Sequence, residues 1–275
     1  QMVLSRPYSP LLNTLAMPQF SIASPAAIQA GTLDAAPVGS GPFAFVQWQA
    51  GAQIRLTGNT AYWGAGPYLQ SLVFQVIPDN AAQYAALQSG AIHGTGSLAL
   101  SYVPTATLDA NLKVAWQPAL NTGYLGTNRA HAPLDNPLVN QAIAHALDKQ
   151  SIVDAHYNAE APRGQVATQL LPPVIWGRDA DLQDYTYDPA QAQALLAQAG
   201  YTQGVTTTLW VMPIERFYLP NPMDIALSMQ VDLEAIGIST TLVTEYDWPT
   251  YLGKIRNGEA DLFMLGWGGD NGHPD

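Results

Sequence analysis

Two loops of this sequence carry one cation and one anion directly after strand-like segments. Arg216 follows the alternating stretch 206–212, and Asp270 follows the apolar stretch 261–267. A fixed guanidinium and a fixed carboxylate suit a small ligand with both a carboxylate and an ammonium group, because the planar guanidinium fork binds both carboxylate oxygens. An extended dipeptide spans about 7 Å, at ~3.3–3.6 Å per residue, and two neighbouring loops can straddle that length. The two residue types therefore indicate a site for a small zwitterion.

Aromatic and small residues flank these two charges. Tyr218 and Trp267 are aromatic side chains that can pack on a ligand. Gly269 and Asn271 adjoin Asp270 in a glycine-rich loop, where backbone amides can approach a ligand closely. Other interpretations stay open from position alone: surface loop charges that face water or pair with each other, aromatic residues of the core, and a plain glycine turn. The candidate ligand-binding set is Arg216, Asp270, Tyr218, Trp267, Gly269 and Asn271.

Enzyme and metal-site signatures are missing from the sequence. It contains no G-x-S-x-G elbow, no phosphate-binding G-x-x-x-x-G-K-[ST] loop and no complete G-x-G-x-x-G after a strand. With no cysteine it offers no thiolate nucleophile, disulfide or cysteine zinc site. The histidines, none of which has metal-binding spacing, are His93, His131, His145, His156 and His273. We therefore expect no catalysis, no bound metal and no cofactor.

The composition is that of a folded, acidic protein. Of its 275 residues, 48% are hydrophobic, and 21 acidic residues against 10 basic ones give a net charge of −11. The shortage of clustered Lys and Arg argues against a nucleic-acid partner and against an anionic membrane surface. No apolar run reaches the ~18–20 residues that span a bilayer, and the start has no signal-peptide pattern. Because the chain starts without Met and stops inside a loop, we expect an excised segment, whose missing signal leaves the location open.

The second half of the sequence alternates strand-like and helix-like segments that would hold both charges. Three strands joined by two helices imply a mostly parallel sheet with right-handed crossovers. In such sheets, ligands gather beyond the carboxyl ends of the strands. The loops of Arg216 and Asp270 are therefore expected at the same edge of one sheet. The predicted strands are 206–212, 239–244 and 261–267, and the predicted helices are 223–236 and 247–257.

The pattern changes near residues 117–128, where we place a domain boundary. Residues 1–122 are expected to form part of a first, strand-rich lobe with a mixed sheet, and residues 123–275 part of a second α/β lobe with a mostly parallel sheet. The further predicted elements are a hairpin of 43–48 with 53–56, a more buried strand at 72–77, and helices at 80–90, 137–148 and 189–200.

Several ordered motifs carry a family resemblance. They are residues 37–43 (PVGSGPF), 62–64 (YWG), 74–82 (FQVIPDNAA), 87–92 (LQSGAI), 124–153 and 265–275 (LGWGGDNGHPD). With these motifs the chain resembles family 5 extracellular solute-binding proteins, which serve ABC importers of peptides, nickel and related solutes. Segments 171–200 and 209–221 make it similar to the periplasmic dipeptide-binding members of that family.

The resemblance implies a periplasmic-binding-protein-like α/β fold with two lobes, mixed sheets and a hinge, incomplete at both ends here. It implies a receptor, periplasmic or attached to the membrane on its outer side, that delivers a small peptide to the membrane permease of an ABC importer. We expect this receptor to be a monomer.

The resemblance also assigns roles to the two charges. In dipeptide-binding relatives the matching Arg and Asp bind the peptide carboxylate and the peptide amino group, which gives these roles to Arg216 and Asp270. His273 and Phe217 depart from the acidic residue and the proline that are usual there. Two alternatives remain: the same fold with a nickel chelate, haem, glutathione or opine-like ligand, and an α/β hydrolase.

Overall fold

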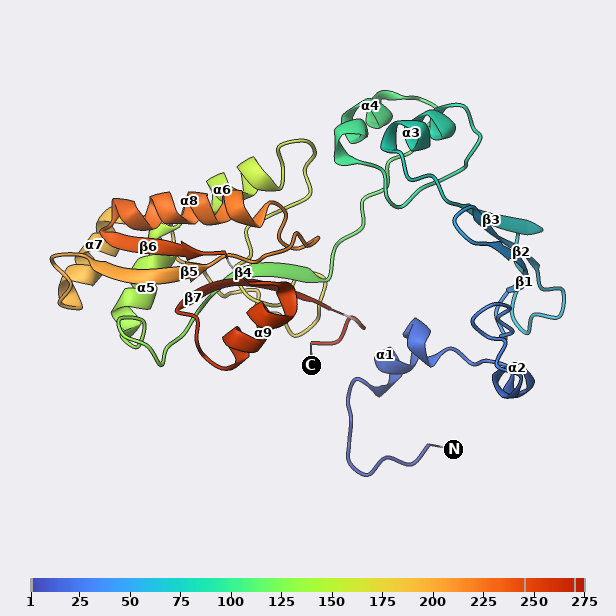
Figure 1. Cartoon of the computed structure of the whole chain (residues 1–275), viewed down its shortest axis with the longest axis horizontal. Helices are drawn as coiled ribbons and strands as arrows, with labels where there is room; N and C mark the ends of the chain where they lie inside the picture. Colours follow the sequence, from blue (N-terminus) through green and yellow to red (C-terminus); the bar gives the residue numbers. More distant parts are fainter. Residues whose placement is uncertain (1, 245, 270, 275) are drawn as a thin grey trace. The chain divides into compact units, whose positions relative to one another are not determined.

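The computed structural model describes residues 2–244, 246–269 and 271–274. Its helices and strands place the chain in the α/β class, as the sequence predicts (Figure 1). The chain divides into two compact units, Gln1–Val114 and Ala115–Pro274, and each is described by itself. This division falls slightly before the boundary expected between residues 122 and 123, and the assignment of the units to two lobes stays a prediction.

The first unit contains a three-stranded sheet in the order β1-β2-β3. Its elements are α1 Leu11–Leu15, η1 Pro18–Phe20, α2 Pro25–Gln29, β1 Phe43–Gln49, β2 Gln53–Gly58, β3 Ser71–Gln75, α3 Asn80–Gln88, η2 Leu100–Tyr102 and α4 Val103–Leu108. The hairpin of β1 with β2 is confirmed. Both pairings in this sheet are antiparallel, whereas we expected a mixed sheet. The physical reason is connectivity, since a short turn returns β1 onto β2 and a parallel pair needs a long crossover.

The expectation that the strand at 72–77 is more buried than its neighbours was wrong. The side chains of Val73 and Phe74 are 46% and 56% exposed in β3. An apolar strand is buried only when other elements cover its faces, and no described helix packs closely against this sheet. The helix predicted after this strand is confirmed as α3, with the Asp79 carboxylate accepting a hydrogen bond from the Ala82 amide at 2.7 Å.

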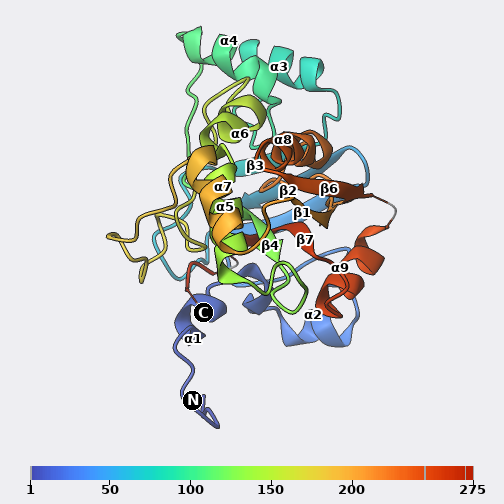
Figure 2. The same ribbon diagram turned by 90° about the vertical axis from the view of Figure 1, so that its left-hand side faces the viewer.

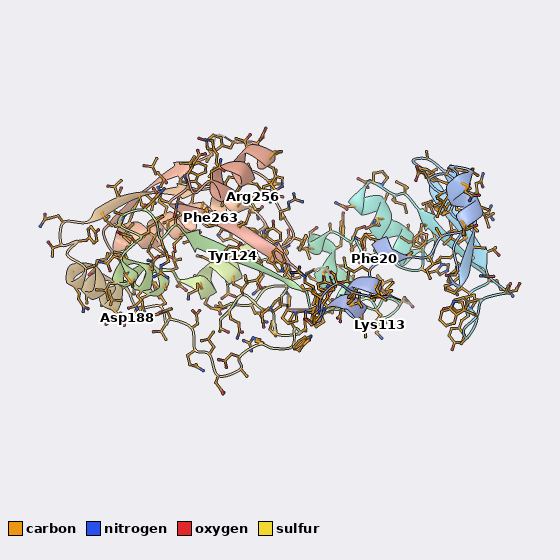
Figure 3. All side chains as sticks on the ribbon, turned by 90° about the horizontal axis from the view of Figure 1, so that it is seen from below. Phe20, Lys113, Tyr124, Asp188, Arg256 and Phe263 are labelled. Atoms are coloured by element: carbon orange, nitrogen blue, oxygen red, sulfur yellow. The ribbon has the colours of Figure 1, made fainter. Side chains whose placement is uncertain are left out.

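The second unit is built around a four-stranded sheet in the order β4-β7-β5-β6. Its elements are β4 Asn121–Thr127, α5 Pro137–Ala146, α6 Lys149–His156, α7 Pro189–Gln198, β5 Val205–Trp210, α8 Pro222–Ala235, β6 Ile238–Val243, α9 Trp248–Arg256 and β7 Leu262–Gly268. β5 pairs in parallel with both β6 and β7, so the alternation predicted from 206 to 267 is confirmed. β4 is the antiparallel edge strand beside β7. Figure 3 labels Tyr124 on β4 and Phe263 on β7.

Local capping residues set where the helices of this unit begin. Asp188 and Asp247 each accept a hydrogen bond from an amide in the first turn of α7 and α9. The helix predicted over 137–148 is shorter than expected, because Leu147 is extended and ends it. Asp148 instead caps a second helix, α6, with its carboxylate accepting the Ser151 amide at 3.0 Å. The sequence pattern merged these two helices into one.

The hydrophobic core of the chain lies in this second unit, around the sheet. Helices α8 and α9 lie on opposite sides of the strands, as Figure 1 and Figure 2 show. Leu209 of β5, Leu262 and Met264 of β7, and Tyr251 of α9 are at most 1% exposed. These close contacts fix the position of β5 relative to β7. The first residues of the loops that follow the two strands are therefore fixed as well.

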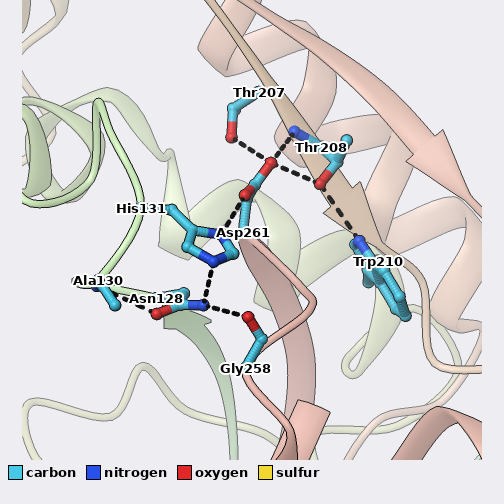
Figure 4. A network of polar contacts seen from close by, with 8 residues as sticks. All are labelled: Asn128, Ala130, His131, Thr207, Thr208, Trp210, Gly258 and Asp261. Atoms are coloured by element: carbon cyan, nitrogen blue, oxygen red, sulfur yellow. Dashed lines mark hydrogen bonds and ion pairs between the residues drawn. The ribbon is translucent and has the colours of Figure 1, made fainter. Parts of the chain in front are cut away.

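A polar network joins β5 to the segment that enters β7 (Figure 4). One carboxylate oxygen of Asp261 accepts hydrogen bonds from the Thr208 amide at 3.1 Å and the Thr208 hydroxyl at 2.7 Å. Its other oxygen lies 2.9 Å from Nδ1 of His131. Burial raises the pKa of Asp261, but the hydrogen bonds from Thr208 and His131 outweigh burial and hold that pKa below its ordinary value. The ionised carboxylate is therefore part of the folded structure.

Replacing Asp261 by asparagine is expected to lower the free energy of unfolding by about 1–3 kcal/mol at neutral pH, because a charged hydrogen-bond acceptor is lost. The depressed pKa means that this stability is fully present above the unfolded-state pKa of about 3.9 and is lost as pH falls through the folded-state pKa. Urea unfolding of both proteins at a series of pH values checks this. The stability difference should shrink in acid, and a difference that stays constant down to about pH 3 would contradict the assignment.

Candidate functional site

The chain that follows β5 runs along the end of β7. β5 and β7 are parallel neighbours, so their carboxyl ends share one edge of the sheet. A Cβ atom on Gly268, the last residue of β7, would lie 3.1 Å from the ring of Phe217. The loop of Arg216 therefore contacts the strand end that leads to Asp270. Asp270 itself lies outside the described residues, and the position of its carboxylate stays a prediction.

A tight turn fixes the position of Arg216 within its loop. The backbones of Arg216 and Leu219 exchange two hydrogen bonds, of 3.2 and 2.9 Å, and Leu219 is only 3% exposed. The hydroxyl of Tyr157 donates to the carbonyl oxygen of Tyr218 at 3.0 Å. Burial raises the pKa of Tyr157 to about 12, so this hydroxyl stays a donor over the physiological range. The turn is thus anchored in the core on one side and to α6's C-terminal end on the other.

The side chain of Arg216 is half-buried and has no anionic partner among the described residues. Its guanidinium carbon lies 4.9 Å from the centroid of the Trp248 ring, and its Nε is buried without a hydrogen-bond acceptor. Partly burying a cation without a counter-charge is unfavourable unless an anion can reach it. The alternative that Arg216 is merely a solvated surface charge does not agree with this environment. Within the described residues, the guanidinium therefore has an aromatic partner and no anionic one.

The two residues that follow Arg216, Phe217 and Tyr218, line a cavity of about 470 Å³, and Arg216 itself is not in the lining. Tyr218, Trp267 and Gly269, three of the predicted residues, are in its lining. Trp267 is 57% exposed, so the alternative that it is a core aromatic residue was wrong. The Tyr218 ring covers Gly266 so closely that a Cβ atom there would lie 2.1 Å from it. The cavity offers an aromatic surface that begins one residue after Arg216 in the chain.

Two of the predicted residues are placed differently from what the sequence suggested. The Gly269 amide donates to the carbonyl oxygen of Leu120, so it is not available to a ligand. Glycine is needed at position 269 for another reason, since a Cβ atom would lie 3.1 Å from Leu120. Asn271 is not in the cavity lining, and its side-chain oxygen accepts the His273 amide at 2.9 Å. The structure groups Tyr218, Trp267 and Gly269, and leaves Asn271 in the loop beyond.

Sequence reasoning missed three contributors to this edge. Leu120 and Asn121 line the cavity from the start of β4, because β4 runs antiparallel to β7 and begins where β7 ends. Nothing in the sequence indicated which strand β4 pairs with. Trp248 could have been found, since a helix that follows a parallel strand starts at the same carboxyl edge of the sheet.

A second hollow of about 450 Å³ lies beyond the ends of β5 and β6 and was not predicted. Glu215 and Asp224 give it two carboxylates, and Tyr246 forms part of its wall. It shares no lining residue with the aromatic cavity. Within the described ranges, no three His, Asp or Glu side chains converge as metal ligands, and no helix has the length and apolar character needed to cross a bilayer.

Comparison with known proteins identifies the family of the chain. Residues 1–275 match the model of the family described as bacterial extracellular solute-binding proteins, family 5 Middle. The Escherichia coli dipeptide-binding protein is 39% identical over 100% of this chain and 52% of its own length. Haem-binding protein A of Haemophilus influenzae is 37% identical over 89% of this chain and 44% of its own length.

The similarity extends to solved structures. The structure of HbpA2 from Haemophilus parasuis has a TM-score of 0.91 and 33% identity over 99% of this chain and 54% of that protein. The chain spans about half the length of the curated relatives it matches. The matched region contains both the turn of Arg216 and the aromatic cavity.

Proposed function

Because this chain belongs to family 5 of the bacterial extracellular solute-binding proteins, we propose that it is part of a receptor that binds dipeptides or short peptides for an ABC importer. The observation that carries this proposal is the half-buried Arg216, whose side chain has no anionic partner among the described residues and whose next two residues, Phe217 and Tyr218, line an aromatic cavity. Such a group binds the terminal carboxylate of a peptide through two parallel charge-assisted hydrogen bonds.

The remaining candidate residues are proposed to contact other parts of the ligand. Tyr218 and Trp267 offer ring surfaces to a peptide side chain. Asp270 is proposed to bind the ammonium group, because the end of β7 approaches the Arg216 loop. Asn271 is a candidate for a further polar contact with the ligand, as the sequence suggested.

We also propose that the site performs no catalysis. Three histidines of the second unit are already engaged by hydrogen-bonding groups of the fold, namely His131 with Asp261, His145 with the Thr186 carbonyl and His156 with the Ser228 hydroxyl. A receptor needs only to bind and release its solute. Its proposed partner is the permease of the importer, and its proposed location is the periplasm or the outer side of the membrane. It is proposed to act as a monomer without nucleic acid.

A different solute is the second candidate function. A relative named for haem binding is 37% identical, nearly as similar as the dipeptide-binding relative at 39%. Haem, glutathione and opines carry carboxylates that Arg216 could also bind, and a nickel chelate with carboxylate groups would present the same chemistry. The family alone does not choose among them, because function belongs to the site and not to the fold.

Native mass spectrometry of the complete protein, purified without denaturation, distinguishes these candidates. We expect a monomer that carries small peptides, and we expect added dipeptide to displace them. A mass corresponding to bound haem, a metal chelate, glutathione or an opine would overturn the peptide assignment in favour of that solute. The same spectrum reports the oligomeric state.

A further inference from the structure

Four aromatic side chains lie in a row behind Arg216. Trp248 and Tyr251 of α9 stack with ring centroids 6.0 Å apart and an angle of 17°. Tyr251 contacts Trp210 at 6.5 Å, and Trp210 stacks on Tyr246 at 5.1 Å and 22°. We call Trp248, Tyr251, Trp210 and Tyr246 the aromatic cluster. It joins the helix α9 to the end of β5, and the guanidinium of Arg216 lies over its outermost ring.

The centre of this cluster is tied to both strands whose ends form the site. Tyr251 is 1% exposed, and its hydroxyl lies 2.6 Å from the Met264 carbonyl oxygen of β7 and 3.1 Å from the Trp210 carbonyl oxygen of β5. Burial raises the pKa of Tyr251, so the hydroxyl remains protonated and donates. On the opposite side, the Trp210 indole donates to the Thr208 hydroxyl at 3.2 Å, within the network of Figure 4. The cluster is therefore fixed relative to the sheet.

Trp248 is held from its backbone as well as from its ring. It is the first residue of α9, and the Asp247 carboxylate accepts the Thr250 amide at 2.8 Å at that helix start. Stacking on the anchored Tyr251 fixes the plane of the indole. The ring that contacts Arg216 consequently has one defined position, which a flexible surface tryptophan would not have.

The partner of the Arg216 guanidinium is an aromatic face and not a described carboxylate. The ring attracts the guanidinium through its quadrupole, yet it leaves the N–H donors of the guanidinium edge unused. A carboxylate in the same place would neutralise the charge and compete with the ligand. A π surface thus orients the cation while its hydrogen-bonding capacity stays available.

We propose that Trp248 is a positioning residue that holds the Arg216 guanidinium in place for the carboxylate of the ligand. This inference rests on the proposed function, because it assumes that Arg216 binds a carboxylate. In this proposal Trp248 does not contact the ligand. Trp248 therefore affects the affinity for the ligand only through the position of Arg216, and removing Arg216 should remove the effect of Trp248.

The experiment is a double-mutant cycle in the complete protein, with dipeptide affinity measured by calorimetry. Trp248→Leu is expected to weaken dipeptide binding by about three- to thirty-fold, the range of a partly desolvated cation–π contact, and Trp248→Phe to recover part of that loss. In the Arg216→Ala background, Trp248→Leu should have no further effect. Trp63→Leu, which removes an 80% exposed indole from the first unit, is the matched control and should bind like wild type.

A second series keeps the test valid if Trp248→Leu unfolds the protein. Mono-, di- and trifluorinated tryptophan placed only at position 248 withdraws electron density from the ring while its shape is nearly unchanged. The dissociation constant should rise stepwise with the number of fluorines, because the attraction depends on the ring quadrupole. Loss of packing alone would not produce such a series, so a flat series would overturn the positioning role.

The outcomes separate this inference from the proposed function. If Arg216→Ala binds dipeptide like wild type, the proposed carboxylate site fails, and the inference fails with it. If Arg216→Ala binds weakly but Trp248→Leu binds like wild type, only the inference is overturned. The same holds if the two substitutions weaken binding additively. Non-additive losses with partial rescue by Trp248→Phe support it.

Discussion

Replacing Arg216 by alanine in the complete protein is expected to weaken dipeptide binding by about 30-fold or more. The substitution removes the cation that we assign to the peptide carboxylate and leaves that carboxylate without a partner in a partly desolvated site. The fold should change little, because the side chain makes no hydrogen bond or ion pair within the described residues. Calorimetric titration gives the affinity, and urea unfolding gives the stability.

Two further variants separate geometry from charge in this prediction. Arg216→Lys keeps the charge but loses the planar fork, so we expect it to bind more weakly than wild type and more tightly than alanine. Arg256→Ala removes the same charge from the exposed end of α9, where Figure 3 labels it, and should leave affinity unchanged. Wild-type affinity in Arg216→Ala would end the assignment. A loss of equal size in Arg256→Ala would show that only net charge matters.

Gly123→Ala is expected to destabilise the protein by about 1–3 kcal/mol and to weaken peptide binding at the same time. A Cβ atom at position 123 would lie 2.4 Å from the carbonyl oxygen of Tyr218, and this backbone atom cannot move unless the turn of Arg216 moves with it. The new methyl group would also lie 3.3 Å from the Tyr157 hydroxyl that holds the turn. Urea unfolding and calorimetric titration of the same preparation report both effects.

Gly253→Ala is the control for this substitution. Gly253 lies inside α9, and a Cβ atom there would meet nothing within 4 Å. Alanine in a helix interior is favoured over glycine, so the control should be stabilised by about 0.5–1 kcal/mol and should bind peptide like wild type. A Gly123→Ala protein as stable as wild type would mean that the turn of Arg216 is mobile, contrary to the anchored arrangement.

The sequence was most informative where the evidence is local. The helices at 80–90, 189–200 and 247–257 each begin at an Asp whose carboxylate caps the first turn. The alternation of strand and helix from 206 to 267 correctly predicted that β5 pairs in parallel with β6 and β7. From this alone, Arg216 and the end of β7 could be assigned to one edge of the sheet. Helix caps, terminating glycines and hydrophobic periodicity are properties of short segments. They can be read from the sequence because they do not depend on contacts between distant segments.

The rest depends on contacts between distant segments. The exposure of Phe74 depends on which elements cover β3, so the composition of the strand alone did not predict this exposure. The Gly269 amide is taken up by Leu120 of another segment, so a glycine that suggested ligand access serves packing instead. The contact of Arg216 with Trp248 joins a loop to the first residue of α9, 32 positions further along the chain. No spacing rule specifies such pairs, because the fold creates them.

The combination of partners around Arg216 agrees with the proposed role of this residue in binding a ligand. The ring of Trp248 and the anchored turn of Arg216 and Leu219 fix the cation, while no described carboxylate neutralises it. Preorganisation of this kind reduces the entropy lost on binding. In the proposed function the ligand supplies the counter-charge, so we expect its affinity to depend on that charge.

The most direct measurement compares a dipeptide with its C-terminal amide in calorimetric titrations of the wild-type protein and of Arg216→Ala. We expect amidation to weaken binding to the wild type by about 30-fold or more and to have almost no effect on Arg216→Ala, because the carboxylate and the guanidinium act as one pair. An equal loss on amidation in both proteins would show that the peptide carboxylate is bound elsewhere and not by Arg216.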